Sequence, residues 1–151
     1  MNAVDTNILI YSVDQHEPAK RDVAQRLLQS LRNSDEETIL PWQVLCETAC
    51  QLRKWAEKQR MSREDAERYI EVFRELFPIE APSLQVFNEA TDLYRRFRLS
   101  HWDSLLVAAC GLAGVTNLYS EDMDAGAEFG EVRIVNPFLD LDLSRRRRSR
   151  P

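Results

Sequence analysis

The sequence contains few of the residues that build tight turns, disulfide bonds or zinc sites. Only four glycines and six prolines occur among 151 residues, which argues against an all-β fold with many turns. The three cysteines, Cys46, Cys50 and Cys110, are odd in number and lack C-x-x-C spacing, and only two histidines are present. This set supplies neither a disulfide framework nor a zinc motif. We therefore expect buried, reduced thiols in a cytoplasmic protein.

Long apolar runs are also missing. The longest weakly polar stretch, residues 102–119, is interrupted by Asp103, two glycines and Asn117, and it is too short and too polar to cross a bilayer. The sequence does not open with the charged and then apolar segment of a signal peptide. We expect a protein without a membrane segment, in the cytoplasm.

Charge is unevenly distributed along the chain. Five arginines stand in the last seven residues, RRRRSRP. Removing these five charges from the net charge of −5 leaves −10 for the rest of the chain. An acidic body does not bind nucleic acid by bulk electrostatics, although bound cations can reverse the sign of a local site. We expect one domain over residues 1–143 and a disordered, arginine-rich tail over 144–151.

Short apolar segments alternate with segments of helical periodicity. Strands are predicted to end at Val4, Pro41, Ser120 and Pro137. Helices are predicted over residues 8–13, 18–33, 44–58, 62–76, 83–97 and 100–113, with 77–82 as a connection. The alternation predicts an α/β fold, with a parallel β-sheet flanked by helices and a helical insertion in the middle. Ligands of such sheets bind beyond the carboxyl ends of the strands.

Four acidic residues stand at the carboxyl ends of strands or at the starts of helices, each beside an apolar run. Asp5 follows the first strand and Asp122 follows TNLYS, while Glu47 and Asp103 lie near the starts of two helices. These positions converge on one rim of a parallel sheet. Carboxylates brought together there repel one another, and hard divalent cations with oxygen ligands relieve that repulsion. The sequence therefore predicts a metal site at this rim.

Each acid alone also has a simpler interpretation. Asp103 completes an S-x-x-D capping box with Ser100, and Asp5 is placed to cap the next helix. Asp122 fits a turn. The simpler interpretation of Glu47 is a solvated residue, but it adjoins an apolar stripe and is expected to be buried. The remaining aspartates are expected at caps or on solvated faces: Asp14, Asp22, Asp65, Asp92, Asp140 and Asp142. The coincidence of four acids, rather than any one of them, favours the metal site.

The segments VDTNILIY, WQVLCETA, WDSLLVAA and LYSEDMDAG, taken in order, resemble a PIN domain, and in particular VapC-type ribonuclease toxins. The resemblance covers nearly the whole chain. It implies a PIN-like fold in which Asp5, Glu47, Asp103 and Asp122 are catalytic and hold Mg²⁺ or Mn²⁺. Asn7 and Ser120 match supporting polar positions. Glu121 and Asp124 compete with Asp122 for the role of the fourth acid.

The resemblance further implies a metal-dependent endoribonuclease that hydrolyses the phosphodiester bonds of a structured RNA such as tRNA or rRNA. It also implies a homodimer and a cognate antitoxin protein. Such a cluster of acids and cations needs no serine, cysteine or histidine nucleophile. Two alternatives remain: a PIN nuclease of RNA processing that has no antitoxin, and a non-catalytic PIN-like binding module whose acids are only caps.

Three further features have more than one interpretation. His101 is expected at a helix end or on the surface, with contact to RNA as the alternative. Trp102 is expected in the core, with stacking on an RNA base as the alternative. The tail is expected to be disordered. Its alternatives are contact with RNA phosphates through Arg145, Arg146, Arg147 and Arg148, and pairing with the acidic body or an acidic antitoxin.

Overall fold

A six-stranded sheet runs through the middle of the computed structural model, which describes residues 1–141. The strands are β1 (Asn2–Val4), β2 (Thr38–Pro41), β3 (Ile79–Glu80), β4 (Asn117–Tyr119), β5 (Glu128–Phe129) and β6 (Val132–Val135). Their order in the sheet is β3-β2-β1-β4-β6-β5. Every neighbouring pair is parallel except β5 and β6, which are antiparallel. The predicted α/β class with a parallel sheet is confirmed.

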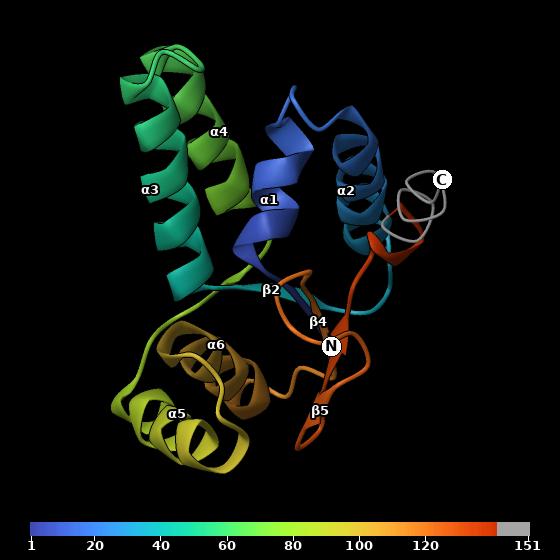
Figure 1. The fold of residues 1–151 in the computed structure, drawn as a ribbon, viewed down its shortest axis with the longest axis vertical. Helices are drawn as coiled ribbons and strands as arrows, with labels where there is room; N and C mark the ends of the chain where they lie inside the picture. Colours follow the sequence, from blue (N-terminus) through green and yellow to red (C-terminus); the bar gives the residue numbers. More distant parts are fainter. Residues whose placement is uncertain (142–151) are drawn as a thin grey trace, which may run out of the picture.

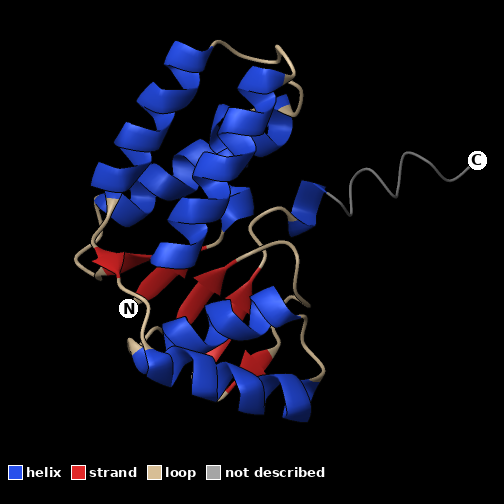
Figure 2. Ribbon diagram, turned by 90° about the vertical axis from the view of Figure 1, so that its left-hand side faces the viewer, coloured by secondary structure: helices blue, strands red, loops and turns tan. Residues whose placement is uncertain are grey.

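Helices cover both faces of this sheet, as Figure 1 and Figure 2 show. They are α1 (Thr6–Val13), α2 (Pro18–Arg32), α3 (Trp42–Glu57), α4 (Arg63–Leu76), α5 (Leu84–Phe97) and α6 (His101–Leu112). Helices α1 to α4 lie on one side, and α5 and α6 pack together on the other. The pair α3 and α4 extends away from the sheet and forms the predicted helical insertion.

Local sequence explains where these elements begin. Ser62, Ser83 and Ser100 each cap a helix, because the serine hydroxyl accepts a hydrogen bond from the backbone N–H three residues later. The central strands β1 and β2 are buried along their whole length, as expected for parallel strands covered on both faces. The six predicted helices are all present, and their ends differ by at most two residues from the predicted ones.

Two short edge strands were not predicted. Residues 77–82 were expected to be a plain connection, but Ile79–Glu80 pairs with β2, and the Leu40 N–H donates to the Pro78 carbonyl over 2.8 Å. At the other edge, β5 pairs with β6 across a two-residue turn in which Gly130 has a φ of +64°. Glycine is favoured at such a position because it adopts a positive φ without strain. Two residues are too few to produce a periodic pattern.

The expectation that all three thiols are buried is wrong for two of them. Cys110 is buried in α6, but Cys46 and Cys50 are exposed on α3. The buried face of α3 carries Val44, Thr48, Leu52 and Trp55, and the two cysteines lie two positions past Val44 and Thr48, on another side of the helix.

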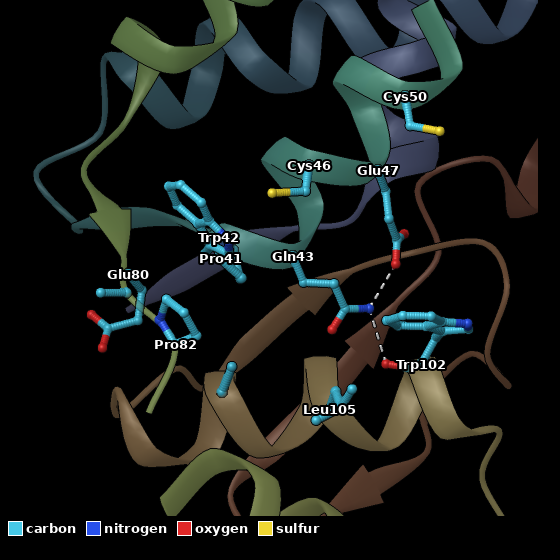
Figure 3. A pocket seen from close by; sticks show the side chains of 12 residues that line it. Pro41, Trp42, Gln43, Cys46, Glu47, Cys50, Glu80, Pro82, Trp102 and Leu105 are labelled. Carbon is cyan, nitrogen blue, oxygen red and sulfur yellow. Dashed lines mark hydrogen bonds between the residues drawn. The ribbon is translucent and has the colours of Figure 1, made fainter. Parts of the chain in front are cut away.

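The burial prediction for Trp102 is also wrong. Trp102 is 60% exposed rather than part of the core; it lies in the first turn of α6, and Figure 3 shows its indole beside Gln43 of α3. Asp14 is a C-cap of α1, one of the two positions expected for it, and it is buried there. Its carboxylate is compensated by Arg60, whose Nη2 donates to Asp14 Oδ1 over 2.6 Å.

The predicted tail, residues 144–151 with Arg145 to Arg148, lies outside the described residues, as do the last residues of the predicted domain. Over residues 1–141, none of the helices is both long enough and apolar enough to cross a membrane.

Candidate active site

The four predicted acids, Asp5, Glu47, Asp103 and Asp122, line one cleft of about 680 Å³. Asp5 and Asp122 follow the parallel strands β1 and β4, Glu47 lies on α3, and Asp103 lies on α6. The structure thus gathers side chains from four separate parts of the chain. The cleft lies beyond the carboxyl ends of the strands, where α/β sheets bind their ligands.

Asp5 is held in place by the turn between β1 and α1. Its backbone N–H donates to the Tyr119 carbonyl over 2.9 Å, which fixes it against β4. Its Oδ1 accepts from the Thr6 N–H over 2.6 Å, so the residue caps α1 as its sequence position suggested. Its Oδ2 accepts from Ser120 Oγ over 2.6 Å. Capping and a place in the cleft are therefore compatible.

The side-chain amide of Asn7 bridges two of the acids. Its Nδ2 donates to Asp5 Oδ2 over 3.0 Å and to Asp122 Oδ2 over 3.1 Å. The Ser120 hydroxyl, which donates to Asp5, accepts from the Asp122 N–H over 3.2 Å. Asn7 and Ser120 thus fix the relative positions of the two carboxylates.

Glu47 is oriented by two residues that the sequence analysis did not single out. Its Oε2 accepts from Thr6 Oγ1 over 3.0 Å, and its Oε1 accepts from Gln43 Nε2 over 2.8 Å. Gln43 precedes Glu47 by four residues, a spacing that puts both on one side of a helix, so the pattern was available in the sequence. Thr6 adjoins Asp5 and therefore connects the Asp5 turn to α3.

Asp103 forms the predicted cap with Ser100. The Asp103 N–H donates to Ser100 Oγ over 3.1 Å, and Ser100 Oγ donates to Asp103 Oδ2 over 2.7 Å. The carboxylate nevertheless lines the same cleft as the other three acids. The cap therefore uses Asp103 Oδ2, and Asp103 Oδ1 accepts no hydrogen bond from Ser100.

The structure separates Asp122 from its two competitors. Glu121 is turned toward Lys20, whose Nζ donates to the two carboxylate oxygens over 2.8 and 2.6 Å, and it also accepts from the Tyr11 hydroxyl over 2.8 Å. Neither Glu121 nor Asp124 lines the cleft. The sequence could not indicate this, because Lys20 lies 101 positions away from Glu121. Only Asp122 of the three acids faces the other carboxylates.

Burial raises the pKa of Asp5 to about 6. The hydrogen bonds from Ser120 and Thr6 act in the opposite direction, and the charges of Asp122 and Glu47 raise the pKa further. Asp14, at another part of the cleft, behaves differently. Burial alone would raise its pKa, but hydrogen bonds from the His16 N–H and from Arg60 outweigh that effect and lower it. Asp5 is thus a buried carboxylate whose hydrogen-bond donors, Thr6, Asn7 and Ser120, are all uncharged.

The donor set of the cleft fits a hard divalent cation. Over residues 1–141, no three Asp, Glu, His or Cys side chains are close enough together to hold one ion directly. Mg²⁺, however, is commonly held by one or two carboxylates and several waters. Asp5 and Asp122, joined by Asn7, supply such a pair, and Glu47 and Asp103 line the same space. A cation would also offset the repulsion from Asp122 and Glu47, which adds to the effect of burial on the pKa of Asp5.

A family model for the PIN domain matches residues 3–130, which is most of the chain. The chain belongs to the PIN domain family. The matched region of this PIN domain begins within β1 and includes all four acids of the cleft. Comparison with curated proteins finds no match.

Solved structures with the same fold include several toxins. VapC20 of Mycobacterium tuberculosis, described as a sarcin-ricin loop cleaving toxin, has 22% identity and a TM-score of 0.66, over 88% of this chain and 99% of that chain. A toxin–antitoxin complex from Klebsiella pneumoniae has 20% identity and a TM-score of 0.60, over 91% and 98%. VapBC2 of Rickettsia felis, bound to a promoter DNA fragment, has 13% identity and a TM-score of 0.65, over 89% and 97%. At these sequence identities the likeness shows a shared fold and nothing more specific.

The remaining predicted site residue, His101, does not line the cleft of the PIN domain. It lies at the start of α6, exposed, with its ring edge-on to Trp102 at a centroid distance of 5.0 Å. Its expected place at a helix end is therefore confirmed. Trp102, by contrast, lines the cleft.

Proposed function

We propose that this protein is a metal-dependent endoribonuclease that hydrolyses RNA phosphodiester bonds, and that it is the toxin of a VapBC-type toxin–antitoxin pair. The observation that carries the proposal is the cleft itself, in which Asp5, Glu47, Asp103 and Asp122 meet from four parts of the chain. Membership of the PIN domain family and likeness to VapC structures support the same activity.

In this proposal the four acids hold Mg²⁺ or Mn²⁺, and Asn7 and Ser120 keep Asp5 and Asp122 in position. A bound cation of this kind lowers the pKa of a water molecule and neutralises charge on the scissile phosphate. Thr6 and Gln43 hold the Glu47 carboxylate toward the cleft. No nucleophilic side chain is required, since water is the attacking group.

The substrate class and the partners belong to the same proposal. A structured RNA such as tRNA or rRNA is the substrate, and the cytoplasm is the site of action. A cognate antitoxin inhibits the enzyme, which acts as a homodimer. Support comes from relatives of the same fold that are toxin–antitoxin complexes, from Klebsiella pneumoniae, Rickettsia felis and Haemophilus influenzae. Co-expression with the protein encoded by the adjacent gene tests the antitoxin, because growth arrest by the toxin alone should be relieved.

Cleavage is expected to require a divalent cation. Purified protein incubated with total RNA and Mg²⁺ should produce defined fragments, whose ends are located by sequencing. Excess EDTA should stop the reaction, and added Mn²⁺ should restore it, because the carboxylates cannot replace the missing positive charge. Fragments that form at the same rate in EDTA would exclude this mechanism.

Asp103→Asn is expected to separate the two roles of that residue. If Asp103 were only a cap, its replacement would cost roughly 0.3–1 kcal/mol of stability and leave cleavage unchanged. If it also binds the cation, cleavage should fall to the level of the protein-free control, and Mn²⁺ should raise the melting temperature of the variant much less than that of wild type. Asp65→Asn is the control, because the Asp65 N–H likewise donates to the N-cap Ser62 of α4 but Asp65 lies outside the cleft, where its carboxylate accepts from Arg68.

A further inference from the structure

We propose that an apolar groove beside the acidic cleft binds one unpaired base of the RNA substrate, stacked on the indole of Trp102. The proposal rests on the proposed ribonuclease function and specifies its substrate as a single-stranded or looped segment. The groove, called here the tryptophan groove, has Trp42, Gln43, Cys46, Pro82, Trp102 and Leu105 among its lining residues (Figure 3).

The tryptophan groove has the size and lining of a ligand site. Its volume is about 370 Å³, within the range of clefts that bind small molecules. Its walls come from the start of α3, the start of α6 and the segment after β3. Among its lining residues only Glu47 and Glu80 are charged. An aromatic base presents two apolar faces and fits such walls.

Two exposed indoles contribute to this groove. Trp102 is 60% exposed and Trp42 is 49% exposed, although burial of an aromatic ring of this size is strongly favourable. In Figure 3, Gln43 lies between the two tryptophans. Stacking on exposed aromatic side chains is the usual way in which proteins hold single-stranded nucleic acid, because every base has a flat π-face.

The tryptophan groove is continuous with the acidic cleft. Gln43, Glu47, Cys50 and Trp102 line both. The Gln43 amide lies at the boundary of the groove and the cleft. Its Nε2 donates to Glu47 Oε1 over 2.8 Å and to the Trp102 carbonyl over 3.1 Å, so it connects α3 to the start of α6. A base seated on Trp102 would therefore hold its own phosphate next to the carboxylates.

This continuity favours a base of the substrate over an apolar segment of a protein partner. A phosphate bound at the proposed cation must have a nucleoside on either side of it. The tryptophan groove is an apolar space that adjoins the cleft where this cation would lie. A duplex does not fit the same arrangement, because its bases are stacked on one another and paired. Selection of an unpaired base therefore follows from the shape of the site.

Binding of a short single-stranded oligoribonucleotide that carries 2-aminopurine tests the stacking directly. The titration is made in Ca²⁺ at fixed salt, and the fluorescence of the base reports its stacking. Trp102→Ala should weaken binding by about 5- to 100-fold and abolish the quenching of 2-aminopurine, whereas Trp102→Phe should retain most of both. Phe87→Ala is the matched control, because Phe87 is a 54% exposed aromatic residue on α5 that lines neither the groove nor the cleft.

Cleavage of RNA with single abasic sites supplies a second test. For wild type, one abasic position beside the cut site should slow cleavage markedly, and for Trp102→Ala the same change should add little, because the stacking is already lost. Equal affinity and equal abasic profiles for wild type and Trp102→Ala would overturn the proposal and assign the groove to another occupant, such as a protein partner. Absence of any RNA cleavage by wild type would instead reject the ribonuclease function.

Discussion

Asp5→Asn is expected to reduce RNA cleavage to background and, in metal-free protein at pH 7, to raise the melting temperature. The Asp5 carboxylate is 6% exposed, and its pKa of about 6 lies above the ordinary value of 3.8. At pH 7 the folded protein therefore contains a buried charge at a cost of roughly 3 kcal/mol. Asparagine removes this charge and remains a good N-cap. Part of the gain is lost because the new amide faces that of Asn7.

The sign of the pH dependence follows from the raised pKa. Between about pH 4 and pH 6 the folded protein binds a proton at Asp5 more readily than the unfolded chain does. The stability contributed by Asp5 is therefore fully present below pH 4 and is lost as the pH rises to about 6. Melting curves in EDTA from pH 4 to pH 8 should show this loss in wild type and its absence in Asp5→Asn. Mn²⁺ should stabilise wild type far more than the variant.

Asp14→Asn is the matched control for this experiment, since Asp14 is buried in the same cleft but paired with Arg60. Its lowered pKa gives the opposite sign, because its stabilisation is present above its ordinary pKa and is lost on acidification. The control should therefore be less stable than wild type at pH 7. An Asp5→Asn protein that is also less stable at pH 7 in EDTA, with unchanged cleavage, would show that Asp5 is only a helix cap.

Lys20→Met is expected to cause a large loss of stability, because Lys20 is a buried charged residue. Lys20 is 8% exposed, and its Nζ contacts Glu121 and the Tyr11 hydroxyl and lies 4.4 Å from the centre of the Tyr11 ring. Removal of the ammonium group leaves Glu121 mostly buried without its cation. The expected cost is about 3 kcal/mol, which corresponds to a fall of roughly 6–12 °C in melting temperature for a domain of this size.

Two further variants make the Lys20 experiment decisive. Lys20→Met/Glu121→Gln should recover part of the loss, because the uncompensated charge is gone and the Tyr11 hydroxyl can still donate to the new amide oxygen. Arg53→Met removes a two-contact ion pair with Glu67 that is more than half exposed, and it should cost under about 0.5 kcal/mol. Equal losses for Lys20→Met and Arg53→Met would refute the idea that burial gives the Lys20 pair its importance.

The sequence was sufficient for those parts of the site that depend on chain position. Asp5 and Asp122 follow strands that end at one rim, and Asp103 follows a capping serine, so their convergence could be predicted from the order of strands and helices. The choice of Asp122 over Glu121 could not, because it depends on Lys20 in a distant helix. Which face of α3 is buried depends on the packing of α1 and α4, which is why the exposure of Cys46 and Cys50 was missed.

The two edges of the sheet are formed by β3 and β5, each of which has only two residues. An edge strand exposes unpaired N–H and C=O groups, and a long one invites further strands to add to it, either from a binding peptide or from another copy during aggregation. Here neither edge offers enough backbone to register an incoming strand. Within residues 1–141, the edges of this sheet therefore disfavour the addition of a strand from a peptide or from another copy, and the sheet resists growth into fibrillar assemblies.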